Sequence, residues 1–235
     1  MNHERHLAYL QAMGIQPWRL KNAPPAEIIA EAPCPAAIEV EPVKIIEQPK
    51  AQAMTWQQLT SEIQNCQQCP RSKTRQQALL GFGDPQAKLL IIAEPPDQEE
   101  DQQNAYFIGD NGTLLNNILL ALNLKREQVY ITPCLKCAET EPKKTFERVE
   151  PCQNWLKNQI ELIRPNCILI LGKVACQQVL KADKKEKMLM LRERKETSYL
   201  DIPVIISYHP RYLLKRPTQK FHTWADLQGV FNYIV

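Results

Sequence analysis

The 235-residue chain has no long run of apolar residues, which excludes a membrane-spanning helix of about 20 residues. Residues 1–5 are polar, and no apolar stretch typical of a secretion signal follows them. We therefore expect a cytoplasmic protein. The formal net charge of +3 says little about partners. No internal repeat is present, so a repeat architecture is not expected.

Local charge is more informative than the total. Residues 181–220 carry eleven Lys or Arg against five Asp or Glu, a local net charge of +6. Such a basic segment suits contact with a nucleic-acid phosphate backbone. A solvated, charged face explains the same composition equally well.

The eight cysteines point to chemistry other than disulfides, which a reducing cytoplasm disfavours. Cys66 and Cys69 form a C-x2-C pair, Cys137 follows a predicted strand, and Cys152 begins the next predicted helix. Four thiolates suit either tetrahedral zinc or an iron–sulfur cluster, and the spacing leaves both open. Cys134 forms a second C-x2-C with Cys137 and is an alternative ligand in its place.

Composition divides the chain into three parts. Residues 1–22 contain a short predicted helix, at 3–13, followed by an apolar peptide. Residues 23–53 are rich in Pro, Ala and Glu, which indicates an extended or disordered linker. A folded domain is expected over 54–235. The N-terminal peptide either docks on a partner or packs back on its own domain.

Short apolar strands alternate with helical patterns in this domain. The predicted strands are 88–93, 128–132, 167–171 and 203–207, and the predicted helices are 56–65, 112–122, 147–163, a helix opening at 172, and 219–234. Continuous apolar strands between helices predict an α/β fold with a parallel sheet covered on both faces. The site should lie beyond the carboxyl ends of the strands, at Glu94, Pro133, Gly172 and His209.

The domain also carries an ordered set of family motifs. They are CQQC (66–69), LIIAEPP (90–96), YFIG (106–109), VYIT (129–132), KC (136–137), QIELIRP (159–165), LG (171–172) and YHPRYLL (208–214). In these motifs the domain resembles the family 4 uracil-DNA glycosylases, the iron–sulfur type. The resemblance implies a three-layer α/β/α fold with a four-stranded parallel sheet. It also implies a [4Fe–4S] cluster on Cys66, Cys69, Cys137 and Cys152.

The resemblance implies an enzyme that flips uracil, or another deaminated base, out of DNA and hydrolyses its N-glycosidic bond. Glu94 and His209 are the expected catalytic residues: His209 would donate to the departing base, and Glu94 would orient water or favour the sugar cation. Phe107 would stack on the base, with Glu100 and Pro133 also at the substrate. The expected DNA-contacting residues are Arg211, Leu213, Leu214, Lys215 and Arg216.

The departures from the family fall on the pocket. Ala93 and Asp97 replace two glycines of the family's first motif, Pro95 removes a backbone N–H there, and Pro133 aligns with an asparagine that reads the uracil edge. Proline has no backbone N–H and cannot make that contact. The segment 138–142 is acidic where the family is basic. These changes predict altered base specificity or an inactive relative.

A second resemblance concerns the N-terminus. Residues 8–20 (AYLQAMGIQPWRL) look like the N-terminal peptide of the psi subunit of the bacterial DNA polymerase III clamp loader. The alternative hypothesis is therefore a catalytically degenerate glycosylase-fold protein that docks on the clamp loader. In either case we expect a DNA-associated monomer.

Overall fold

The computed structural model describes residues 54–138, 149–194 and 197–234. The predicted helix and docking peptide within 1–22, the linker 23–53 and most of the acidic segment 138–142 lie outside these residues. Among the described helices, none is long and apolar enough to cross a membrane.

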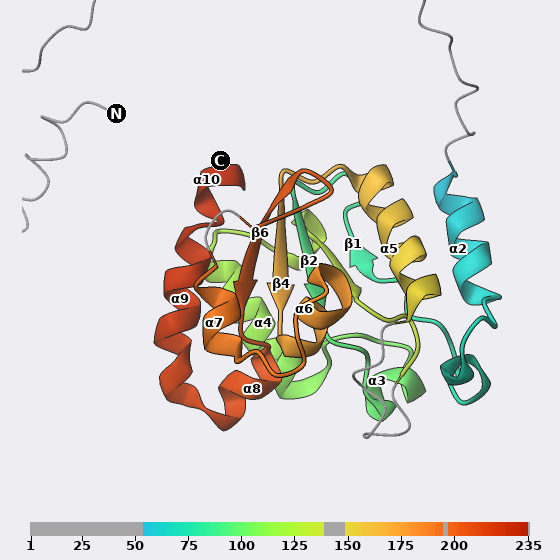
Figure 1. Cartoon of the computed structure of the whole chain (residues 1–235), viewed down its shortest axis with the longest axis horizontal. Helices are drawn as coiled ribbons and strands as arrows, with labels where there is room; N and C mark the ends of the chain where they lie inside the picture. The colour runs from blue at the N-terminus through green and yellow to red at the C-terminus, as the bar shows by residue number, and fades with distance from the viewer. Residues whose placement is uncertain (1–53, 139–148, 195–196, 235) are drawn as a thin grey trace, which may run out of the picture. The chain divides into compact units, whose positions relative to one another are not determined.

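A single six-stranded sheet forms the centre of the domain, in the order β1-β3-β2-β4-β6-β5 (Figure 1). Its four central strands are parallel: β2 (Leu89–Ala93), β3 (Tyr130–Pro133), β4 (Cys167–Leu171) and β6 (Ile202–Ser207). All residues of β2, β3 and β4 are buried, as expected for strands covered on both faces. The predicted parallel α/β sheet is confirmed.

Two helical layers cover the sheet. Alternate strand residues such as Ile91 and Leu169 face α4 (Gly109–Ala121), α8 (Pro210–Lys215) and α9 (Lys220–Gln228). The other strand residues face the helices α5 (Glu150–Ile163), α6 (Lys173–Leu180) and α7 (Met188–Arg192). Figure 1 shows α6 in front of the strands and α4 behind them. The expected three-layer α/β/α architecture is therefore present.

Smaller elements complete the domain. Leu59 and Ile63 of α2 (Trp56–Gln64) pack against α5, and a capping box between Thr55 and Gln58 fixes the start of α2. The remaining elements are η1 (Pro70–Lys73), α3 (Gln98–Gln102), η2 (Arg126–Gln128), η4 (Pro217–Gln219) and α10 (Phe231–Ile234).

The four-stranded prediction is wrong in its count. The two further strands, β1 (Phe82–Gly83) and β5 (Ser198–Tyr199), pair antiparallel with β3 and β6 at the sheet edges. Each has only two residues, too few for an alternation pattern in the sequence. The last predicted helix, 219–234, is divided into α9 and α10 at Gly229.

Candidate functional site

The register of the parallel strands brings the predicted site residues to one edge of the sheet. Ala93 pairs with both Pro133 and Leu171, and Leu171 pairs with Ser207. Glu94, Pro133, Gly172 and His209 therefore lie at or just beyond the same carboxyl edge, as the sequence predicts. The arrowheads of β4 and β6 mark this edge at the lower side of the sheet in Figure 1, near α8.

Glu94 is held against the start of α6. A Cβ atom on Gly172 would lie 2.4 Å from Glu94 Oε1, so the carboxylate occupies space that only glycine leaves free. Val174 N–H donates to the same oxygen at 3.4 Å, and the Tyr106 hydroxyl donates to the Glu94 carbonyl. The helix N-terminus favours the ionised carboxylate at this position.

His209 caps α8 and is buried, with 4% of its surface exposed. Its Nδ1 accepts the backbone N–H of Arg211 at 3.1 Å. Burial, assisted by the charge of Arg211, lowers the pKa of His209 to about 3, so the ring is neutral at physiological pH. A neutral imidazole whose Nδ1 accepts must carry its proton on Nε2, which makes Nε2 a hydrogen-bond donor.

The low pKa of His209 gives a testable dependence of stability on pH. The unfolded chain takes up a proton near pH 6.5, whereas the folded chain does so only near pH 3. The contribution of His209 is therefore complete above about pH 6.5 and is lost as pH falls, by about 2 kcal/mol at pH 5. Between pH 7 and pH 5, the melting temperature should fall about 4–8 °C further in the unsubstituted chain than in His209→Gln. Equal decreases in calorimetry would contradict this assignment.

Phe107 has a left-handed backbone conformation, with φ of 57°, which is uncommon for a bulky residue. Its N–H donates to Glu100 Oε1, and its carbonyl accepts from Arg126 Nη2, both at 2.9 Å. The ring is buried and stacks on His209, with centroids 5.3 Å apart and planes at 18°. In this structure Phe107 supports His209; contact with a base stays a prediction.

Glu100 and Arg211 hold this loop together. Glu100 is 2% exposed, and its Oε2 accepts the N–H of Asp97 at 2.9 Å. Burial raises the pKa of Glu100, against the hydrogen bonds and the nearby Arg211. Arg211 Nη2 lies 2.8 Å from Asp97 Oδ2 and 3.7 Å from Glu100 Oε2. Both residues thus fix the Phe107 loop beside His209, whereas the sequence predicts substrate contact for Glu100 and DNA contact for Arg211.

A cleft of about 520 Å³ opens beside His209 and Glu94. The residues lining it come from the ends of β2, β4 and β6 and from α6, α7 and α8: Glu94, Gly172, Lys173, Lys187, Met188, Leu189, Tyr208, His209, Arg211, Tyr212 and Lys215. Three lysines at this cleft fit an anionic ligand.

The residues predicted to contact DNA divide into two groups. Leu214, Lys215 and Arg216 are exposed near the cleft, so their surfaces are accessible to DNA. Leu213 is 1% exposed and packs in the core with residues of α4. In this structure the Leu213 side chain is part of the domain interior, and its contact with DNA stays a prediction.

The Pro133 carbonyl contacts a buried lysine, Lys136, to which the sequence analysis gave no role. Lys136 Nζ donates to Thr132 Oγ1 at 2.6 Å, to Gln159 Oε1 at 2.5 Å and to the Pro133 carbonyl at 3.1 Å. Burial lowers the pKa of Lys136 to about 7, and the neighbouring thiols Cys152, Cys134 and Cys137 oppose this shift. The sequence signal that could have identified Lys136 is its position directly before Cys137, a candidate ligand.

Arg75 contacts two of the four predicted cysteine ligands. Arg75 Nη1 donates to Cys137 Sγ at 2.9 Å, and Arg75 Nη2 donates to the Cys66 carbonyl at 2.9 Å. Burial raises the pKa of the Cys137 thiol to about 12, Arg75 opposes the rise, and Cys152 and Cys69 add to it. Burial also raises the pKa of the Cys152 thiol, and the charges of Cys69 and Cys66 add to this rise. The four thiols are thus electrostatic neighbours.

Cys134 has different charged neighbours from Cys137. Burial raises the pKa of the Cys134 thiol, and the charge of Glu94 adds to the rise. Its backbone N–H donates to Ala93 O at 2.8 Å, which ties it to the end of β2. In the part of the chain that the structure describes, no three His, Cys, Asp or Glu side chains form a ligand group for a single metal ion.

The chain is similar to known uracil-DNA glycosylases. A family model described as the Uracil DNA glycosylase superfamily matches residues 80–228. The type-4 uracil-DNA glycosylase of Archaeoglobus fulgidus is 34% identical over 178 residues, covering 73% of this chain and 89% of the relative. Those of Pyrobaculum aerophilum (29% identical; 76% and 94% covered) and Thermotoga maritima (30%; 75% and 93%) are also similar.

Proposed function

Because the chain belongs to the uracil DNA glycosylase superfamily, we propose that it hydrolyses the N-glycosidic bond of uracil, or of another deaminated base, in DNA. The observation that carries the proposal is a neutral, buried His209 beside Glu94 at the mouth of a basic cleft. The reaction needs the base to leave the stack and enter the site. Water then adds to the sugar C1′ while the base leaves with the electrons of the glycosidic bond, and the proton that the water loses ends on the departed base.

His209 stabilises the departing base. Negative charge grows on a base oxygen as the bond breaks, and the Nε2–H of neutral His209 is a donor suited to that charge. The ring is prevented from rotating by the Arg211 N–H on Nδ1 and by the face of Phe107. A donor fixed in this way needs no reorganisation during the reaction.

Glu94 acts on the sugar, the other group joined by the glycosidic bond. Its carboxylate is held by Val174 N–H at the start of α6 and lines the cleft together with His209. An ionised carboxylate there stabilises the cationic sugar and orients the attacking water. The carboxylate and the hydrogen-bond donor thus belong to residues at the ends of two different strands, β2 and β6.

This pocket discriminates between bases less strictly than the pockets of other family members do. Pro133 is buried, and its carbonyl is already bound by Lys136, so it offers no amide to a uracil edge. Losing such a reading group costs about 1–3 kcal/mol of discrimination. We therefore include other deaminated bases in the proposed substrate range.

DNA binding involves the rim of the cleft. Lys187 and Lys215 are exposed there, and Leu214, with 41% of its surface exposed, is an apolar side chain next to Lys215 that could fill the vacated stack. Arg211 contributes indirectly, because Asp97 engages its guanidinium.

The four thiols fit a [4Fe–4S] cluster on Cys66, Cys69, Cys137 and Cys152. Such a cluster takes one thiolate for each iron and does not require several donors around one ion. Arg75 supplies an N–H directed at Cys137 Sγ, and the backbone N–H of Lys136 donates to the Cys152 thiol. These donors stabilise thiolates, which burial alone disfavours. When bound, the cluster would brace the segment 66–75 against β3 and α5.

Purified protein incubated with oligonucleotides containing uracil, hypoxanthine or xanthine should produce abasic sites, seen as alkali-cleaved strands. A thymine oligonucleotide of the same sequence is the control. Pro133→Asn should raise the ratio of uracil to hypoxanthine excision by about 10-fold or more, since it restores an amide at the reading position. No abasic product on any deaminated base, in single- or double-stranded form, would refute the proposal.

Clamp-loader docking is not part of this proposal. The peptide that predicts it lies outside both the described residues and the segment matched by the family model.

A further inference from the structure

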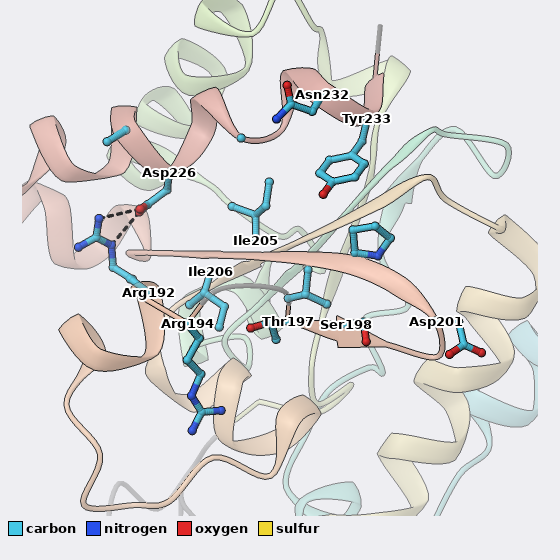
Figure 2. Close-up of a pocket in the computed structure, with 14 residues that line it drawn as sticks. Arg192, Arg194, Thr197, Ser198, Asp201, Ile205, Ile206, Asp226, Asn232 and Tyr233 are labelled. Carbon is cyan, nitrogen blue, oxygen red and sulfur yellow. Dashed lines mark hydrogen bonds and ion pairs between the residues drawn. The ribbon is translucent and has the colours of Figure 1, made fainter. Parts of the chain in front are cut away.

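A carboxylate on α9 collects three hydrogen bonds from two other elements. Asp226 Oδ2 accepts from Arg192 Nε and from Ser207 Oγ, and Asp226 Oδ1 accepts from Arg192 Nη2, each at 2.7 Å. Figure 2 shows the two-pronged contact between Arg192 and Asp226. Their side chains are only 6% and 10% exposed. This bidentate geometry is the strongest and most directional form of ion pair.

The pair holds the two residues that precede His209. Ser207 ends β6 and is bonded directly to Asp226. Tyr208 follows, and the Arg192 guanidinium carbon lies 4.6 Å from the centroid of its ring. The side chains of both residues that lead into His209 are therefore held, Ser207 by Asp226 of α9 and Tyr208 by Arg192 of α7.

The same segment is secured toward the cleft by other contacts. The Gly172 N–H donates to the Ser207 carbonyl at 3.0 Å, and the rings of Tyr208 and Tyr212 stack with centroids 4.8 Å apart. Arg192 is also the last residue of α7, whose first two residues, Met188 and Leu189, line the cleft. One ion pair thus links a cleft wall to the strand end that carries His209.

We propose that Arg192 and Asp226 are a positioning pair for His209, which hold its imidazole in register with the departing base without touching the substrate. The inference rests on the proposed glycosylase function. A buried ion pair is a weak source of net stability, because desolvation offsets most of its attraction. Its directional bonds do fix geometry, and a displacement of about 1 Å at a catalytic group can cost about 100-fold in rate.

The chain offers a matched control pair two residues away. Arg194 Nη2 bonds Glu186 Oε2 at 2.6 Å, and Figure 2 shows its guanidinium directed away from Asp226. This pair has the same charged groups, but it joins the two flanks of α7, has side chains that are 39% and 22% exposed, and makes no hydrogen bond to the end of β6 within the described residues. Glu186→Gln should leave the excision rate unchanged.

The test uses the full chain with its metal content matched between variants. Single-turnover excision is measured for Asp226→Asn and Arg192→Lys, with Ser207→Ala as the mildest change. The first two should lower the rate about 10- to 100-fold, while the dissociation constant for uracil DNA changes less than about threefold. A native rate in both folded variants would overturn the proposal.

A double-substitution cycle separates positioning from a general structural role. If Asp226 acts through His209, Asp226→Asn should cost less than about twofold more when His209→Ala is already present. The same 10- to 100-fold loss in that background would show that the pair acts elsewhere, and would overturn the proposal.

Imidazole ¹⁵N spectra at pH 7 provide a readout independent of activity. His209 should show a single tautomer, protonated at Nε2, in the unsubstituted chain and in Glu186→Gln, and a mixture in Asp226→Asn. An unchanged His209 spectrum in both Asp226→Asn and Arg192→Lys would refute the positioning role. If the unsubstituted chain excises no base, the proposed function fails, and these spectra still decide the inference.

Discussion

Replacing His209 by alanine should lower the single-turnover rate of base excision by about 100- to 1,000-fold, with little change in DNA affinity. This is the loss seen when one fixed donor to a developing negative charge is removed. His209 is neutral, its Nδ1 is occupied by Arg211 N–H, and its ring stacks on Phe107, so its Nε2–H is the donor available to the base. Water entering the vacated space would donate less effectively, because it is not held in place.

His222→Ala is the matched control. His222 is exposed on α9, and only its backbone carbonyl, which the substitution keeps, contacts Arg192. Its rate should equal that of the unsubstituted chain. A loss below tenfold in His209→Ala, measured with enzyme in excess, would show that another group carries the charge of the departing base.

The architecture was largely predictable because its strands are short, continuous apolar runs. LLIIA and CILIL are buried on both faces, and this composition leaves few alternatives to a central parallel sheet. The edge strands β1 and β5 were not predictable, since two residues carry no period. Nor was α8, whose six residues follow His209 and are preceded by strand-forming residues.

The site was predictable in its position but not in its contacts. Strand ends indicated Glu94 and His209, and the parallel register brings them to one edge. Glu100 and Arg211 were also expected near the substrate, but their charges are mainly engaged with each other, with Asp97 and with Phe107 N–H. Which charged side chain faces solvent and which holds a loop depends on packing between distant segments, and no local pattern encodes this.

The same limit applies to the residues that support the site. Arg192 and Asp226 are separated by 34 positions, and each looks like an ordinary surface charge on a short helix. Leu213 and Leu214 are adjacent apolar residues, yet one is in the core and the other is 41% exposed. If the start of this helix is placed one residue too early or too late, the wrong leucine is assigned to the core. The sequence alone could therefore not choose between them.

Replacing Cys137 by alanine should remove the iron and lower the stability of the domain by at least about 4 kcal/mol, as expected when a metal site is lost. The corresponding fall in melting temperature is about 8–16 °C. Protein purified without oxygen should be brown, with broad absorbance near about 400 nm. Cys137→Ala should be nearly colourless, because three remaining thiolates leave one iron without its protein ligand and expose the cluster.

Cys134→Ala is the informative partner variant, since it removes a buried thiol three residues away. Burial raises the pKa of the Cys134 thiol, and the charges of Glu94 and Cys152 add to the rise. Cys137 accepts a hydrogen bond from Arg75, and its pKa is raised by burial and by the charges of Cys152 and Cys69. Cys134→Ala should therefore keep its colour and its iron, and lose only the stability of one buried thiol. Bleaching of Cys134→Ala with Cys137→Ala still brown would exchange the ligand assignment. Colourless, zinc-containing protein from the unsubstituted chain would reject the cluster, because the same four thiolates would then hold a tetrahedral ion.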